Sequence, residues 1–206
     1  MLSTGTWVIA AALGAPLDRL DEGADMPANV NALGQPVACM RFMGGREFAG
    51  PAGTDAAPCG PAELERLVGR GTMALPCFSA SGGPFVGRAG KILGAAPETP
   101  AERYALATLY CVLMSDYCLD ALGATGPVVV EGSFTDNAHF APLLAALRAG
   151  REVAVSDDAS GTVCGAWMLR HWGRQPAANG RAAVPLALAG WPAYRARWRA
   201  LLAAPA

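Results

Sequence analysis

Apolar residues along this chain fall into short runs, which are separated by turns rich in glycine and proline. Runs of strand-like length and alternation predict strands over residues 7–12, 31–40, 128–131 and 152–156. Segments with apolar residues three and four positions apart predict helices over residues 62–69, 100–122, 137–148, 159–172 and 192–202. Glycine-rich stretches predict loops over residues 50–61 and 79–94.

The clearest helix signal is the stretch Thr99-Pro100-Ala101-Glu102. Thr99 is a good N-cap, Pro100 suits the first turn, and Glu102 completes a capping box. The helix is expected to run to about Leu122 and to stop at Gly123. Apolar residues surround it on all sides, which predicts a mostly buried helix.

The order of these elements predicts the fold class. Strands come first, and then helix, strand, helix, strand and helix alternate along the second half. Alternation of this kind is typical of parallel strands joined by crossover helices. We therefore expect one α/β domain over residues 1–206, with a mixed, partly parallel sheet flanked by helices.

Two turns of small residues are the candidate ligand-binding sites. Glu131-Gly132-Ser133-Phe134-Thr135-Asp136-Asn137 follows an apolar run and precedes a helix, and Thr4-Gly5-Thr6 lies at the start of the chain. Strand–turn–helix junctions present backbone N–H groups and a helix N-terminus to phosphate groups. The alternatives are a plain hairpin turn for Thr4-Gly5-Thr6 and a helix N-cap for Asn137.

Other polar groups favour structural roles. Asp157-Asp158 precedes a predicted helix, where carboxylates cap the helix and complement its dipole, although an acid–base or magnesium role is the alternative. His139 and His171 have no cysteine or carboxylate at metal-binding spacing, so no metal-ligating residue is assigned.

Composition narrows the class of protein. The chain is 52% hydrophobic and 16% charged, which is enough apolar material for a core and argues against disorder. The net charge of −1 argues against nucleic acid as a partner, and no apolar run reaches the roughly 18 residues that span a membrane. Six cysteines without a C-x-x-C pair favour reduced thiols in the cytoplasm.

The order of these motifs resembles the actin-like ATPase (ribonuclease H-like) fold, and more narrowly the C-terminal lobe of the FGGY carbohydrate kinases. Three stretches carry the resemblance: Ser3-Thr4-Gly5-Thr6-Trp7, then Gly132 through Asn137, then Val153 through Gly165-Ala166. The residue sequence of the first stretch is most similar to that of the rhamnulokinase and fuculokinase branch. The resemblance spans nearly the full chain.

The resemblance implies which residues contact a nucleotide. Thr4, Gly5 and Thr6 match the second phosphate loop, and Gly132, Ser133 and Asn137 match the adenosine motif. Gly44 and Gly45 match a further turn on the nucleotide side. Ser133 and Phe134 stand where the family often carries glycine, so Phe134 either stacks on the adenine or narrows the cleft.

The implied activity is transfer of the γ-phosphoryl group of ATP, with Mg²⁺, to a hydroxyl of a ketose-type sugar. In the family, the Asp that acts as general base and the sugar-binding N-terminal lobe both precede this region. We therefore expect no catalytic residue within residues 1–206 and an isolated chain that is inactive and marginally stable. The alternative is a truncated or vestigial nucleotide-binding fragment, and a homodimer is one option for its assembly.

Overall fold

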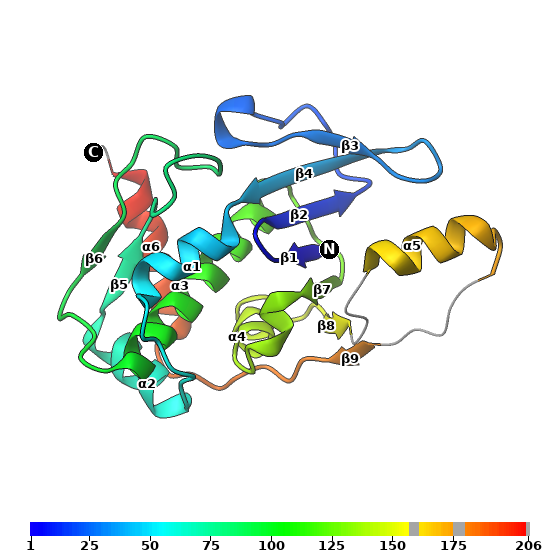
Figure 1. Ribbon diagram of the computed structural model, residues 1–206. Coiled ribbons are helices and arrows are strands. Elements are labelled where there is room, and N and C mark those ends of the chain that lie inside the picture. Colours follow the sequence, from blue (N-terminus) through cyan, green and yellow to red (C-terminus); the bar gives the residue numbers. More distant parts are fainter. Residues whose placement is uncertain (157–160, 175–179, 205–206) are drawn as a thin grey trace.

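A computed structural model describes residues 1–156, 161–174 and 180–204 of the chain. Its main feature is a seven-stranded sheet with the strand order β3-β4-β2-β1-β7-β8-β9 (Figure 1). The strands of this sheet are β1 (Leu2–Thr4), β2 (Val8–Leu13), β3 (Ala28–Val30), β4 (Pro36–Phe42), β7 (Val128–Gly132), β8 (Val153–Ser156) and β9 (Gly180–Ala182). A separate two-stranded sheet pairs β5 (Met73–Leu75) with β6 (Lys91–Leu93).

The large sheet is mixed, as the order of predicted elements indicated. β1 is antiparallel to β2 and parallel to β7, while β8 continues the parallel part. β4 is antiparallel to β2 and therefore runs in the same direction as β1. The carboxyl ends of β1, β4, β7 and β8 consequently lie along one edge of the sheet.

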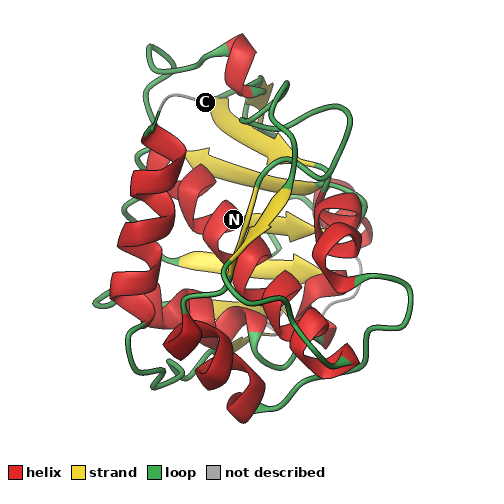
Figure 2. Cartoon of the chain, turned by 90° about the vertical axis from the view of Figure 1, so that its left-hand side faces the viewer, coloured by secondary structure: helices red, strands yellow, loops and turns green. Residues whose placement is uncertain are grey.

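The helices gather mainly around the long helix α3, which packs against β2 and β4 and contacts α1, α2 and α4. Figure 2 shows the layer of helices in front of the strands, and Figure 1 shows α5 standing apart from the other helices. The helices are α1 (Gly44–Ala52), α2 (Pro61–Arg70), α3 (Pro100–Ala121), α4 (Phe140–Leu147), α5 (Gly161–Arg170) and α6 (Trp191–Ala203), with 3-10 turns η1 (Glu22–Ala24) and η2 (Ser133–Asp136).

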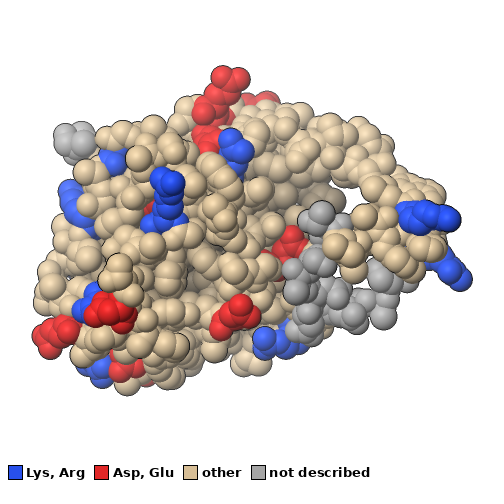
Figure 3. All heavy atoms as spheres, in the orientation of Figure 1, with Lys and Arg blue, Asp and Glu red and all other residues tan. Residues whose placement is uncertain are grey.

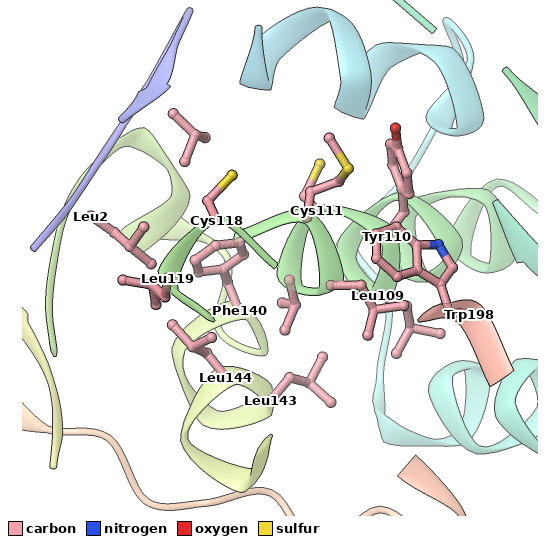
Figure 4. Packing of buried hydrophobic residues seen from close by; sticks show 14 of the residues in the cluster. Leu2, Leu109, Tyr110, Cys111, Cys118, Leu119, Phe140, Leu143, Leu144 and Trp198 are labelled. Atoms are coloured by element: carbon pink, nitrogen blue, oxygen red, sulfur yellow. The ribbon is translucent and has the colours of Figure 1, made fainter. Parts of the chain in front are cut away.

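The core lies between the sheet and these helices. Leu119 of α3 packs with Phe140, Leu143 and Leu144 of α4, and Leu2 of β1 approaches the same cluster (Figure 4). All five side chains are at most 1% exposed. Most residues of α3 between Glu102 and Leu119 are buried, which confirms the prediction of a mostly buried long helix.

Aromatic side chains fasten the last helix to the rest of the molecule. The indole N–H of Trp191 donates to the carbonyl of Leu143 at 3.1 Å, and that of Trp198 donates to the carbonyl of Ala74 at 2.8 Å. Both indoles are almost fully buried. A buried indole N–H needs such a partner, so these residues serve packing and anchoring.

Charged residues also join the helices through a buried ion cluster. Asp116 of α3 is fully buried and lies 3.3 Å from the guanidinium of Arg148, 2.6 Å from that of Arg195 and 2.7 Å from that of Arg199. Asp120, one turn further along α3, pairs with the same three arginines. This cluster links α3 to α6 and to the end of α4.

The exposed charges show a different arrangement. On the face drawn in Figure 3, acidic and basic residues are interspersed rather than gathered into a field of one sign. Within the part of the chain that the structure describes, no helix has both the length and the apolar character needed to cross a membrane.

Local expectations differ from the structure at several points. A turn between β3 and β4 interrupts the predicted strand 31–40, the predicted loop 79–94 contains β6, and the predicted helix 137–148 begins only at Phe140. Helix α1 occupies a stretch for which no helix was predicted, and its end at Ala52 overlaps the predicted loop 50–61. The capping box of α3 is only half formed, because Thr99 Oγ1 accepts from the N–H of Glu102 at 3.1 Å but the Glu102 carboxylate accepts from the N–H of Glu98 at 2.8 Å. Arg66 and Arg70 pair with that carboxylate and hold it away from the Thr99 N–H.

Candidate functional site

The candidate turns follow three strands whose carboxyl ends share one edge of the sheet. Thr4-Gly5-Thr6 follows β1, Gly44-Gly45 follows β4 as the first turn of α1, and Gly132-Ser133-Phe134 follows β7. Ligands of α/β proteins bind at such carboxyl edges, where turns and helix N-termini present backbone N–H groups.

The start of α1 is docked closely on the first turn. The Gly45 N–H donates to the carbonyl of Thr6 at 3.3 Å. A Cβ atom on Gly44 would lie 2.5 Å from a methyl group of Val8 and 3.1 Å from the carbonyl oxygen of Gly5. Only glycine allows this approach of a helix start to the neighbouring turn.

The first turn is also fastened to the turn that follows β7. Thr4 Oγ1 donates to the carbonyl of Glu131 at 2.5 Å and accepts from the N–H of Phe134 at 3.0 Å. Gly132 has a φ of 87°, and a Cβ atom there would overlap the carbonyl oxygen of Thr4. The structure therefore brings most of the candidate nucleotide-binding residues together: Thr4, Gly5, Thr6, Gly44, Gly45, Gly132, Ser133 and Phe134.

We expect Thr4→Val to loosen this junction. Valine has the shape of threonine but leaves the partly buried N–H of Phe134 without an acceptor, which costs about 1–2 kcal/mol of unfolding free energy. Hydrogen exchange of the Phe134 amide should quicken at least about tenfold in Thr4→Val. Thr4→Ser retains the hydroxyl and is the matched control, and equal protection of Phe134 in both variants would contradict the role of Thr4.

The remaining residues of the third turn point in different directions. Ser133 is exposed, whereas Phe134 is partly buried and its ring packs against Phe48 and Phe140 at centroid distances of 5.8 Å and 5.1 Å. The ring of Phe134 is thus part of the packing beneath the turn.

Asn137 lies at the end of η2 and faces α3. Its amide Nδ2 donates to Thr108 Oγ1 at 2.8 Å, and its Oδ1 accepts from the N–H of His139 at 3.1 Å. The N-cap position of α4 is held by His139, so the interpretation of Asn137 as the helix N-cap was wrong. Asn137 instead holds the turn against the long helix.

Sequence reasoning missed Glu47, which follows the glycines of α1 and is only 1% exposed. Its carboxylate accepts from Tyr110 Oη at 2.6 Å, from the thiol of Cys77 at 2.8 Å, and from the N–H groups of Phe78 and Ser79 at 2.9 Å each. Glu47 therefore fixes α1, and the glycine turn at its start, to both α3 and the segment that follows β5. A charged residue at this position of a helix looks solvated in the sequence, so no local signal reveals this role.

A second missed network surrounds Trp7, which directly follows the first turn. The guanidinium carbon of Arg41 lies 4.7 Å from the Trp7 ring centroid, and a Cβ atom on Gly82 would lie 2.7 Å from the Trp7 ring. Asp25 joins the two sides: it pairs with Arg41 at 2.9 Å and accepts from the Gly83 N–H at 2.9 Å. The Gly82-Gly83 segment thus forms a rim beside the first turn.

Arg46 was also missed. It lies in the first turn of α1, directly after Gly44-Gly45, and it is exposed. Among the contacts of the described residues, no hydrogen bond or ion pair of its guanidinium is found. An unpaired cation beside the N-terminus of a helix favours an anionic ligand at this edge.

The cysteine thiols and the metal-binding residue types of the described chain offer no further reactive site. Burial raises the pKa of the Cys59 thiol to about 11, and burial together with the hydrogen bond to Glu47 raises that of Cys77 to about 12, so both are protonated and weakly nucleophilic at neutral pH. Within residues 1–156, 161–174 and 180–204, no three His, Cys, Asp or Glu side chains lie together as a metal site. Asp157-Asp158 lies outside the described residues.

Fold and site together define a class of protein. A mixed sheet carrying glycine- and threonine-containing turns at one carboxyl edge is the arrangement expected for an actin-like ATPase lobe. Residues 1–179 match the model of the C-terminal domain of the FGGY carbohydrate kinases, and the chain belongs to this family.

Solved structures support the same fold. A carbohydrate kinase from Novosphingobium aromaticivorans is 34% identical, with a TM-score of 0.85 over 97% of this chain and 46% of its own length. Xylulose kinase from Rhodospirillum rubrum (18% identity, TM-score 0.69) and gluconate kinase from Lactobacillus acidophilus (14%, 0.63) share the fold over 98% and 97% of this chain. The chain covers 46% and 44% of these two relatives' own lengths. No curated protein matches the chain.

Proposed function

We propose that this chain is the nucleotide-binding lobe of an ATP-dependent carbohydrate kinase. The observation that carries the proposal is the convergence of the three turns after β1, β4 and β7 at one edge of the sheet. Backbone N–H groups held in this way stabilise phosphate oxygens without reorganisation.

In this proposal, different residues contact the phosphates and the adenosine of the nucleotide. Thr4-Gly5-Thr6, the Gly44-Gly45 turn and Arg46 face the phosphates. Gly132, Ser133 and Asn137 shape the adenosine side, with Phe134 packed behind the turn. Phosphoryl transfer needs mainly positioning and charge neutralisation, and Mg²⁺ bound to the ATP phosphates supplies part of that charge.

The sugar side of the cleft belongs to the remainder of the kinase in this proposal. That part supplies the base that accepts the proton of the attacking sugar hydroxyl, since no catalytic residue is assigned to this lobe. A ketose-type sugar of the rhamnulokinase or fuculokinase branch is the acceptor that we propose. We place the enzyme in the cytoplasm, because the six cysteines form no C-x-x-C pair, a pattern that favours reduced thiols, and because ATP is abundant there.

Gly45→Val tests the phosphate assignment. Gly45 is exposed, and its Cβ would lie no closer than 3.7 Å to the Thr6 backbone, so the variant folds while its methyl groups enter the space between the turns. We expect the affinity for ATP·Mg²⁺, measured by calorimetry on the 206-residue chain, to fall at least about tenfold, which corresponds to about 1.4 kcal/mol.

Gly69→Val is the matched control, because a Cβ atom on Gly69 of α2 meets nothing within 4 Å. It should leave the ATP affinity unchanged. Equal ATP·Mg²⁺ affinities of Gly45→Val and Gly69→Val would show that the Gly44-Gly45 turn does not contact the phosphates. Failure of the unaltered chain to bind millimolar ATP·Mg²⁺ would overturn the proposed function of this lobe.

A further inference from the structure

A cavity of about 410 Å³ lies between the small sheet and the last helix. The strands β5 and β6 and the helix α6 lie side by side in Figure 1, and α6 contacts β5. The lining comes from these elements and from the segment that joins the two strands, and we call this cavity the β5–β6 cleft. Its volume falls within the range of roughly 300–1,000 Å³ that small-molecule sites occupy.

The β5–β6 cleft has an apolar base. Leu75 of β5 and Leu202 of α6 are buried, and the apolar lining is completed by Pro76, Leu93 and Leu201. Apolar surface of this kind is unfavourable to leave in water. The base of the cleft therefore favours a ligand with an apolar body.

The charged residues of the cleft are both cations. Arg88 and Lys91 are exposed, and no acidic side chain is among the described residues that line the cavity. Among the contacts of the described residues, neither cation has an ion pair or a hydrogen bond. The guanidinium carbon of Arg88 lies 5.6 Å from the centroid of the Phe85 ring. The cleft thus combines an apolar base with positive charge that no carboxylate neutralises.

The register of the small sheet places Lys91 on the face that packs inward. Lys91 pairs with Leu75, so both side chains point to the same face, and Leu75 is only 5% exposed. An apolar residue is expected at such a position, yet it holds the only lysine of the chain. The lysine stem can lie along apolar surface while its ammonium group reaches the mouth of the cleft. This register is a second observation, independent of the cavity, that favours an anionic ligand.

We propose that the β5–β6 cleft binds an organic carboxylate with an apolar chain or ring. The apolar body lies against Leu75 and Leu202, and the carboxylate lies between Arg88 and Lys91, which neutralise its charge. A neutral ligand of the same shape lacks the attraction to the cations, and a small inorganic anion lacks the apolar contact. The cleft shares no residue with the turns after β1, β4 and β7, so its ligand is bound independently of ATP.

The alternative role of the two cations is structural. Helix α6 ends at Ala203, beside the cleft, and lysine or arginine near the end of a helix complements the helix dipole. In that role the cations stabilise α6 and have no effect on a ligand. Affinity and stability measured on the same variants therefore separate the two roles.

Titration of the 206-residue chain with sodium octanoate, followed by NMR of the backbone amides, tests the site. We expect saturable shifts at the amides of Lys91 and Leu202, with a dissociation constant of about 1 mM or below. Octanol has the same chain without the charge, and inorganic phosphate has charge without the chain. Each of these should bind at least about tenfold more weakly than octanoate.

Lys91→Met and Arg88→Met each remove one charge and keep much of the apolar stem. Each variant should weaken octanoate binding at least about threefold, and the double variant at least about tenfold. Arg19→Met is the matched control, because Arg19 is exposed and does not line the cleft, and it should leave the affinity for octanoate unchanged. Thermal unfolding of each variant shows that the fold is retained.

Equal affinities for octanoate and octanol would overturn the proposal, as would a dissociation constant for octanoate above about 10 mM. A Lys91→Met variant that loses thermal stability but binds octanoate as the parent chain does would assign Lys91 to the end of α6 instead. The affinity of the parent chain for ATP·Mg²⁺, measured separately, decides the proposed function alone.

Discussion

Replacing Asp116 by alanine is expected to lower the free energy of unfolding by about 3–5 kcal/mol. Asp116 is fully buried and is the shared partner of Arg148, Arg195 and Arg199. Its loss leaves the side chain of Arg148, which is only 1% exposed, with a charge that Asp120 neutralises only in part. Removal of one partner from a buried ion pair is costly because the other charge stays desolvated.

Urea unfolding followed by circular dichroism measures this loss. Glu98→Ala removes one carboxylate from an exposed pair, since Glu98 is 79% exposed and lies 3.9 Å from Arg70, and it should cost less than about 1 kcal/mol. The double variant Asp116→Ala, Arg148→Met removes the stranded charge as well and should recover a large part of the loss. If Asp116→Ala is as mild as Glu98→Ala, the buried cluster contributes no net stability.

Glu47→Gln is the second substitution with a large expected effect, about 2–4 kcal/mol. Each carboxylate oxygen of Glu47 accepts two hydrogen bonds: Oε1 from Cys77 and Ser79, and Oε2 from Phe78 and Tyr110. A glutamine places an NH₂ group against one of these donor pairs in either orientation. The backbone N–H groups of Phe78 and Ser79 cannot turn away, so one of them is left facing another donor.

Thermal and urea unfolding of Glu47→Gln give the size of the loss. The matched control is Glu65→Gln, at an exposed residue of α2, and no change in stability is expected for it. Tyr110→Phe removes a single donor and should cost about 1 kcal/mol. A Glu47→Gln variant as stable as Glu65→Gln would show that the buried carboxylate does not fix α1 to the segment after β5.

Elements with strong local signals were predictable from the sequence. Helix α3 begins at Pro100 as predicted from the Thr99 cap, and the strand–turn–helix order around Gly132 is also found. Helix α1 was not predictable, because Gly44, Gly45 and Pro51 disfavour a helix and only packing against α3 compensates.

The candidate site shows the same division. The turns at Thr4–Thr6 and at Gly132–Phe134 could be found from composition, since small residues signal turns. Their hydrogen-bonded contact through Thr4 depends on the pairing of β1 with β7, which no local pattern specifies. Glu47 and the contacts of Trp7 with Arg41 are likewise products of tertiary structure.

The hydrogen bonds of Thr4 also determine when the site can form during folding. They join residues that are 127 and 130 positions apart in the chain, so the first turn gains these partners only after β7 has paired with β1. Closing so long a loop costs entropy before any contact stabilises it, and long-range strand pairing of this kind is slow. During synthesis, the turn at Thr4–Thr6 therefore acquires the geometry of a binding site only after Phe134, 130 positions further along, has been made.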